Sequence, residues 1–183
     1  MIRVFYGKDE FSIHERIKEI RLTAFSSELG DINTAFLDGK DLSRQELIST
    51  ASTVPFMSEN RLVIVDNLAK KFEFGRGAPK PKLGDWEGIE SDLGIIPETT
   101  ELIFREGDLN PRNPMISALK NVAKVIFFRS LRHQEVIGWI INRADYMNTM
   151  IDRPAASLLA ESIGGDLRIL STELEKLSLY KQG

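Results

Sequence analysis

The run Arg-Leu-Val-Ile-Val at residues 61–65 restricts the fold of this chain more than any other segment. Four apolar residues follow one another there, and most of them are β-branched. Because successive side chains of a strand point to opposite faces, a strand of this kind must be covered on both faces. Such strands belong to parallel sheets with helices on either side, so residues 61–65 predict a buried strand of an α/β domain.

The first 130 residues alternate between strand and helix patterns, as a mainly parallel sheet requires. Segments rich in β-branched and aromatic residues predict the strands, and apolar residues spaced three and four apart predict the helices. In addition to 61–65, strands are expected at 2–7, 33–39, 100–104 and 124–128, and helices after Asp9 or Ser12 and at 43–51, 86–96 and 114–123.

Beyond residue 130 only helix patterns occur. Helices are expected at 132–147, 153–165 and 166–180, where Pro154 and a Gly pair frame the second of them. We therefore expect two domains, an α/β domain at 1–130 and a small helical domain at 131–183. A domain of about three helices is minimal, so we expect the chain to be part of a longer protein.

The composition excludes several kinds of protein and site. The 183 residues include no cysteine, which rules out disulfides, thiolate metal sites and a cysteine nucleophile. No apolar run reaches the roughly 18 residues of a membrane helix, and the N-terminal apolar run is too short for a signal peptide. The net charge of −3 argues against a surface devoted to nucleic acid. We expect a soluble, cytoplasmic protein without membrane contact.

An α/β domain followed by a helical lid is the arrangement of the AAA+ ATPases, whose fold is of the P-loop NTPase type. A P-loop needs glycines that let backbone N–H groups surround phosphate, followed by Lys and Ser or Thr. Gly7 stands at the matching place, but Ser12, Ile13 and His14 replace the required Gly, Lys and Ser/Thr, and Lys8 comes too early. We expect no working phosphate site.

The hydrolytic motif is also incomplete. In AAA+ ATPases an Asp-Glu pair ends the corresponding strand, where Asp holds Mg²⁺ and Glu polarises water. Here Asp66 is kept and Asn67 replaces the Glu. Asn cannot act as a base. The histidines, His14 and His133, are far apart in the sequence and form no metal motif. We therefore expect no catalytic residues, no bound metal and no cofactor.

Two other features can be interpreted in more than one way. Four apolar residues, Val54, Pro55, Phe56 and Met57, lie side by side just before the strand expected at 61–65 and either cover the domain's own core or contact a partner. A long loop at 70–88 is basic, and it either keeps the chain soluble or contacts DNA phosphates. The basic residues are Lys70, Lys71, Arg76, Lys80 and Lys82.

Four segments, spread over nearly the whole chain, carry a resemblance to a known family. They are FYGKDEFSIHERI at 5–17, LDGKD at 37–41, VPFMSENRLVIVDN at 54–67 and GGDLRILSTELEKLSLY at 164–180. In their order and spacing they resemble the delta subunit of the bacterial DNA polymerase III clamp loader. Members of this family are longer and have a third, helical collar domain, which this sequence is expected to lack.

The resemblance implies a function in DNA replication. A delta subunit binds one protomer of the ring-shaped sliding clamp, the beta subunit, and favours opening of the ring without hydrolysing ATP. It is a non-catalytic subunit of the DNA polymerase III holoenzyme, a DNA-directed DNA polymerase (a nucleotidyltransferase). Its other partners are the gamma/tau and delta-prime subunits, and DNA binding occurs through the assembled complex. The expected location is the nucleoid-associated replisome in the bacterial cytoplasm.

The resemblance also implies a binding site. In the family, two adjacent apolar residues, often Leu-Phe, enter a hydrophobic pocket of the clamp. Pro55 and Phe56 stand at these positions, so Phe56 keeps the aromatic anchor and Pro55 departs from the usual Leu. Val54 or Met57 is expected to supply the missing apolar contact.

Two alternatives from other functional classes remain at this point. A nucleotide-binding AAA+ ATPase with a degenerate site would depend on Gly7, Lys8 and Asp66. A DNA-binding module would depend on the basic residues of the 70–88 loop.

Overall fold

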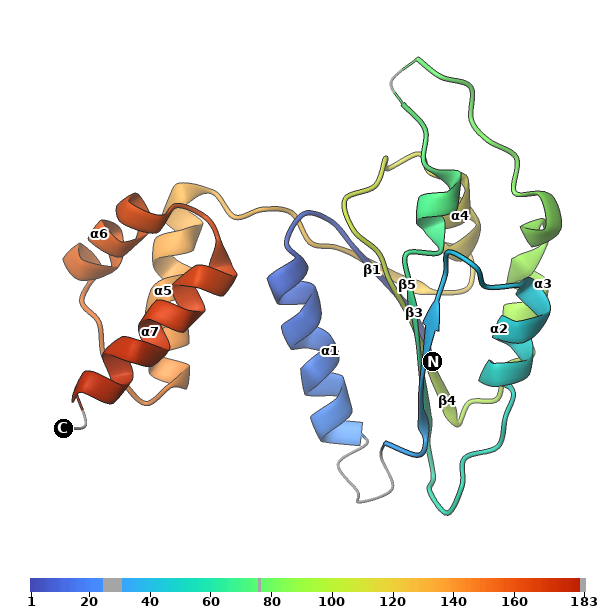
Figure 1. Ribbon diagram of the computed structural model, residues 1–183, viewed down its shortest axis with the longest axis horizontal. Coiled ribbons are helices and arrows are strands. Elements are labelled where there is room, and N and C mark those ends of the chain that lie inside the picture. The colour runs from blue at the N-terminus through green and yellow to red at the C-terminus, as the bar shows by residue number, and fades with distance from the viewer. Residues whose placement is uncertain (25–30, 76, 182–183) are drawn as a thin grey trace. The chain divides into compact units, whose positions relative to one another are not determined.

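The computed structural model of the chain describes residues 1–24, 31–75 and 77–181. The chain divides into two compact units, Met1–Phe128 and Arg129–Gly183 (Figure 1). Among the described residues, no helix combines the length and the apolar composition needed to cross a membrane.

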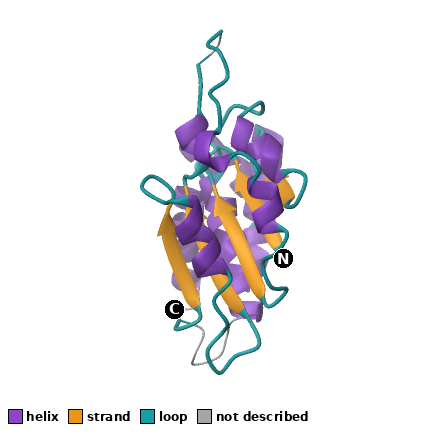
Figure 2. Ribbon diagram, turned by 90° about the vertical axis from the view of Figure 1, so that its right-hand side faces the viewer, coloured by secondary structure: helices purple, strands orange, loops and turns teal. Residues whose placement is uncertain are grey.

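The first unit contains a five-stranded sheet in the order β2-β3-β4-β1-β5. All four strand pairs are parallel, and Figure 2 shows the strands side by side with their arrowheads toward the same end. The predicted parallel α/β fold is confirmed. The strands are β1 (Ile2–Tyr6), β2 (Thr34–Asp38), β3 (Arg61–Asp66), β4 (Thr100–Arg105) and β5 (Lys124–Phe127).

Helices cover both faces of this sheet (Figure 1). On one face, α1 (Glu10–Ala24) packs Ile13 and Ile17 against Leu62 and Ile64 of β3. The opposite face of β3 lies in a second, larger core, so Leu62 to Val65 are all buried. That larger core is covered by α2 (Arg44–Ala51), α3 (Ile89–Leu93), α4 (Pro114–Leu119) and the short 3₁₀ helices η1 (Ala69–Phe72) and η2 (Gly84–Trp86).

The segment after β3 is more ordered than the sequence suggests. Residues 70–88 were expected as one long loop, and this prediction is only partly right, because η1 overlaps the start of the range and η2 lies near its end. The helix expected at 86–96 is also too long, since α3 spans only Ile89–Leu93 between Gly88 and Gly94. Gly88 has φ of +73°, a left-handed conformation that does not continue a helix.

The side chain of Arg44 in α2 holds η2 and α3 of this segment in place. The Arg44 Nε donates a hydrogen bond to the Asp92 carboxylate at 2.6 Å, which joins α2 to α3. Its two terminal nitrogens donate to main-chain carbonyls of the same segment, so one guanidinium holds both η2 and the start of α3. The carbonyl acceptors belong to Asp85, Glu87 and Gly88. Contacts over more than 40 positions of sequence are not visible in a local pattern.

The described residues of the second unit form three helices, α5 (His133–Tyr146), α6 (Arg153–Ile163) and α7 (Leu167–Lys181). The Asp152 side chain accepts the N–H of Ala155 and caps α6, with a proline in its first turn. Val136, Ile140 and Leu170 are buried between the helices. The predicted helical C-terminal region is confirmed.

Gly39 provides a test of how tightly the loop after β2 packs. Its N–H donates to the Asp66 carbonyl at 2.7 Å, and a Cβ at this position would lie 2.4 Å from the backbone of Leu68. We expect Gly39→Ala to lower the free energy of unfolding by about 1–3 kcal/mol in urea titrations, because backbone atoms must move. Gly107→Ala is the matched control, because its Cβ would meet no atom within 4 Å. Equal urea midpoints for the two variants would contradict this packing.

Candidate functional site

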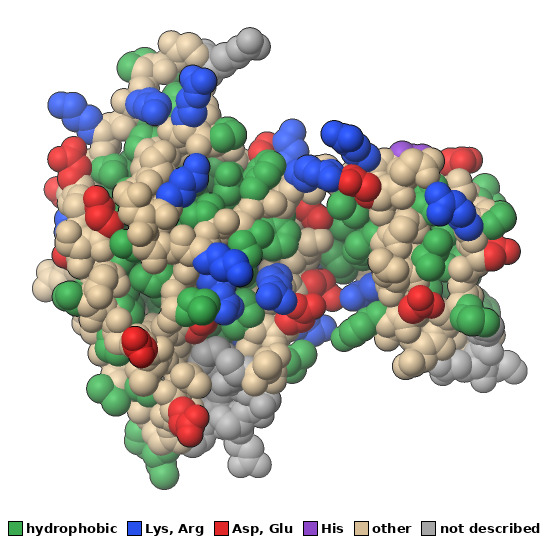
Figure 3. Space-filling model, turned by 180° about the vertical axis from the view of Figure 1, so that it is seen from behind, with side chains coloured by type: hydrophobic (Ala, Val, Ile, Leu, Met, Phe, Trp, Pro, Cys, Tyr) green, Lys and Arg blue, Asp and Glu red, His purple; other side chains and the backbone are tan. Residues whose placement is uncertain are grey.

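The apolar turn between α2 and β3 points its side chains into solvent. Val54 and Met57 are each 79% exposed and Phe56 is 58% exposed, whereas Pro55 is partly buried. Figure 3 shows apolar side chains reaching the surface at this end of the α/β unit. Phe56 therefore does not cover the core of its own domain, which was one of the two interpretations of this turn. The turn is an exposed apolar surface.

The side chain of Asn33 fixes the backbone of this turn. Asn33 precedes β2 and is only 1% exposed. Its Oδ1 accepts the N–H of Phe56 at 2.6 Å, and its Nδ2 donates to the carbonyl of Phe56 at 2.9 Å. The main-chain carbonyl of Asn33 accepts the N–H of Leu62 at 2.9 Å. One residue thus joins the exposed turn to the start of the buried strand β3.

Sequence reasoning missed Asn33, which it placed at the start of an expected strand. An amide side chain carries a donor and an acceptor in one plane, which is what a main-chain N–H and C=O of one residue require. The local signal is a polar residue directly before β2. This signal identifies the contact with Phe56 only when the pairing of β2 with β3, which sets Thr34 beside Leu62, is known.

Met57 adds a strained position to the same turn. Its φ is +47°, in the left-handed region that non-glycine residues rarely adopt. Ser58 and Asn60 stabilise the exit from the turn, because the Asn60 N–H donates to Ser58 Oγ at 3.4 Å. Such conformations persist only where surrounding contacts determine them, and they cluster at binding sites.

The opposite end of the sheet holds the positions where an ATPase would bind phosphate. Gly7 has φ of +137°, and a Cβ there would lie 2.0 Å from the carbonyl oxygen of Phe128. Its N–H donates to the Gly107 carbonyl at 3.0 Å. The glycine therefore allows close packing against the end of β5. Lys8 lies 3.7 Å from Asp108 in an exposed ion pair.

Asp66, the residue expected to hold Mg²⁺ in an ATPase, is paired with Arg105. Arg105 donates from Nε to Oδ1 at 2.6 Å and from Nη2 to Oδ2 at 2.5 Å, which is a bidentate pair. The N–H of Asn67 donates to the Arg105 carbonyl at 3.0 Å. In the described part of the chain, no three His, Asp or Glu side chains gather as a metal site would require. Arg105 was not identified from the sequence, because its pairing depends on β3 and β4 being neighbours in register.

Glu106, directly after β4, is a second charged residue that sequence reasoning did not identify. It is 2% exposed, and its Oε1 accepts the N–H of Ala69 at 2.9 Å at the start of η1. Its Oε2 is buried without a hydrogen-bond partner among the described residues. Burial raises the pKa of Glu106 to about 8, against the opposing effect of the Ala69 hydrogen bond. The carboxyl group is therefore mainly protonated at neutral pH.

The basic residues after β3 do not all have the same role. Lys71 donates to the Leu42 carbonyl at 3.0 Å and lies 5.8 Å from the centre of the Trp86 ring, so it stabilises the fold locally. Lys70, Lys80 and Lys82 are exposed, and Figure 3 shows Lys and Arg side chains around this end of the unit. Arg76 lies outside the described residues. Contact of this segment with DNA stays a prediction.

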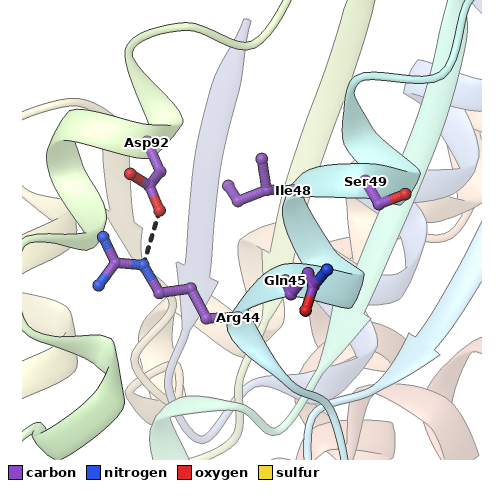
Figure 4. A pocket seen from close by; sticks show the side chains of 5 residues that line it. All are labelled: Arg44, Gln45, Ile48, Ser49 and Asp92. Atoms are coloured by element: carbon purple, nitrogen blue, oxygen red, sulfur yellow. Dashed lines mark hydrogen bonds and ion pairs between the residues drawn. The ribbon is translucent and has the colours of Figure 1, made fainter.

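A hollow of about 550 Å³ lies between α2 and α3 (Figure 4). Arg44 and Asp92 point toward each other at its edge, while Gln45, Ile48 and Ser49 come from α2. The hydrogen bond from Arg44 lowers the pKa of Asp92, which keeps this carboxylate charged and paired. The lining thus contains no free base next to a nucleophile, and the hollow does not have the arrangement of an active site.

Comparisons with known proteins agree with one another. A family model described as DNA polymerase III, delta subunit, matches residues 4–128, and a second model, described as a middle domain, matches residues 132–182. DNA polymerase III subunit delta of Bacillus subtilis (strain 168) is 28% identical over 177 residues, which cover 96% of this chain and 50% of that protein.

A solved structure gives the same result. The Bacillus subtilis DNA clamp loader delta protein has a TM-score of 0.74 and 26% sequence identity to this chain. The match covers 98% of this chain and 53% of that one. The chain therefore spans about half the length of the relatives that it matches.

The buried carboxyl group of Glu106 predicts a pH dependence of stability. Its ordinary pKa of 4.5 rises to about 8 on folding, so the folded chain binds one more proton between these values. The stability that this group contributes is complete below about pH 4.5 and is lost as the pH rises through about 8. We expect Glu106→Gln, which does not titrate, to be more stable than the parent chain at pH 8.5, by about 1–4 kcal/mol.

Urea unfolding at pH 5 and pH 8.5 measures this difference. Glu98→Gln is the matched control, because Glu98 is exposed and its substitution should leave the pH dependence of the parent chain unchanged. The interpretation is wrong if Glu106→Gln loses as much stability between the two pH values as the parent chain does.

Proposed function

The chain belongs to the DNA polymerase III delta subunit family, and from this premise we propose that it binds a sliding clamp and favours opening of the ring. The family resemblance noted from the sequence is confirmed. The proposed contact is the turn formed by Val54, Pro55, Phe56 and Met57. The observation that carries the proposal is a Phe56 ring held in solvent by a backbone that Asn33 fixes.

The energetics of this turn suit a binding role. Complete burial of a Phe side chain contributes about 1.5–3 kcal/mol, and aromatic anchors in pockets are common binding hot spots. Ordering a loop on binding reduces affinity, and here the Asn33 hydrogen bonds and the fixed φ of Pro55 already restrict the turn. Val54 and Met57 add exposed apolar area on either side of the anchor.

The carboxyl end of the sheet supports a role without ATP hydrolysis. Asp66 is paired with Arg105, and Gly7 is packed against the end of β5, so neither residue offers the geometry of a nucleotide site. We therefore propose a non-catalytic accessory subunit of the polymerase complex. The fixed Asp66 also gives the alternative of a degenerate AAA+ ATPase no structural support.

The proposed partners follow from membership of the family. They are the sliding clamp, the gamma/tau and delta-prime subunits of the loader, and DNA through the assembled complex in the bacterial cytoplasm. We further propose that residues 1–130 and 131–183 act as separate domains, which the division into two compact units supports.

Phe56→Ala tests the proposal. We expect this variant to bind the cognate sliding clamp more weakly by roughly 2 kcal/mol or more, a loss of about 30-fold, because it removes the anchor. The melting temperature should stay nearly unchanged, since the ring is 58% exposed in the free chain. Calorimetric titration with the clamp measures the affinity, and a thermal melt monitors the fold.

Leu22→Ala is the matched control, because Leu22 is 62% exposed on α1 and lies outside the turn. It should leave clamp affinity unchanged. The proposal fails if Phe56→Ala binds the clamp as tightly as the parent chain. A large fall in the melting temperature of Phe56→Ala would instead assign the ring a role in stability.

A further inference from the structure

We propose that Ile32, directly before β2, forms a second segment of the clamp-binding surface and that its neighbour Asn33 positions the first segment. This inference rests on the proposed function, since it assumes that the turn at 54–57 contacts the clamp. Asn33 is a positioning residue that holds the Phe56 backbone, and Ile32 enlarges the apolar area that contacts the clamp.

The contacts of Asn33 are specific for one residue of the turn. Its side chain pairs with both the N–H and the carbonyl of Phe56, at 2.6 and 2.9 Å, although 23 positions separate the two residues. Because Asn33 is 1% exposed, water does not compete effectively for these bonds. Since only main-chain atoms are held, the Phe56 ring remains outside and available to a partner.

Ile32 brings an apolar side chain to the same end of the sheet. It precedes Asn33 and is 60% exposed, which is close to the 58% of Phe56. The parallel register sets Thr34 beside Leu62, so residues 32 and 33 lie next to the start of β3. An exposed Ile at this point is not needed to fill the core.

The apolar residues of the proposed surface come from two chain segments joined by the Asn33–Phe56 pair. Groups of exposed apolar side chains on one face mark protein-binding sites more often than single ones do. Their continuity with the turn indicates one occupant, the apolar pocket of the sliding clamp that receives Phe56. The members are Ile32, Val54, Phe56 and Met57.

Titration of the sliding clamp into variants of this chain tests the Ile32 contact. We expect Ile32→Ser to weaken clamp binding about 3- to 10-fold at an unchanged melting temperature, because it removes apolar area from the interface. Leu22→Ser is the matched control, with similar exposure on α1, and it should have no effect.

A double-mutant cycle tests the positioning role of Asn33. Asn33→Ala should weaken clamp binding about tenfold in the parent chain, and much less in a chain that already carries Phe56→Ala, because no ring is left to position. A merely structural role would produce the same loss in both backgrounds. If Asn33→Ala does not fold, the clamp affinities of Ile32→Ser and Leu22→Ser decide whether the second segment contacts the clamp.

The outcomes separate this inference from the proposed function. The second segment is refuted, and clamp binding stands, if only Phe56→Ala weakens clamp binding. In that case Ile32→Ser binds the clamp as tightly as Leu22→Ser does, and the effects of Asn33→Ala and Phe56→Ala on the binding free energy are additive. If Phe56→Ala leaves binding unchanged, the proposed function itself is refuted. Loss of affinity in Ile32→Ser together with non-additivity at Asn33 supports the inference.

Discussion

The burial of β3 on both faces is the constraint on which the rest of the structure depends. Its neighbours β2 and β4 run parallel to it, so every loop that enters a strand reaches one end of the sheet and every loop that leaves a strand reaches the other. The exposed turn and Asn33 therefore meet at the amino end. Asp66, Arg105 and Glu106 gather at the carboxyl end. The parallel strands thus separate the exposed apolar turn from the end where nucleotides bind in related folds.

The sequence was sufficient for those features that depend on local pattern. The apolar run at 61–65 predicts a strand buried on both faces, and the change to helix patterns after residue 130 predicts the second unit. The residues that pair across strands could not be predicted in the same way. Asn33 and Arg105 acquire their partners from strand order and register, which a single sequence does not contain. The short helices after β3 were missed for a similar reason, since Arg44 holds them from α2.

At the carboxyl end of the sheet, polar groups pair with one another within the chain. Asp66 and one oxygen of Glu106 are each engaged by a neighbouring group of the same chain, whereas Glu106 Oε2 has no hydrogen-bond partner among the described residues. Arg105 neutralises Asp66, and the buried carboxyl group of Glu106 occupies the N–H of Ala69. A phosphate would need free backbone donors and an unpaired cation at this place. These paired groups are therefore not available to a phosphate, while the strands keep their parallel arrangement.

The reciprocal bond between Asn33 and Phe56 separates the anchor from the fold. Because Asn33 holds only main-chain atoms, the side chain at position 56 can be exchanged without removing either hydrogen bond. In the proposed role, substitutions at position 56 can therefore change the size and shape of the side chain offered to the clamp while both hydrogen bonds to Asn33 are kept. A contact of this kind would allow the chain to change with its partner through single substitutions.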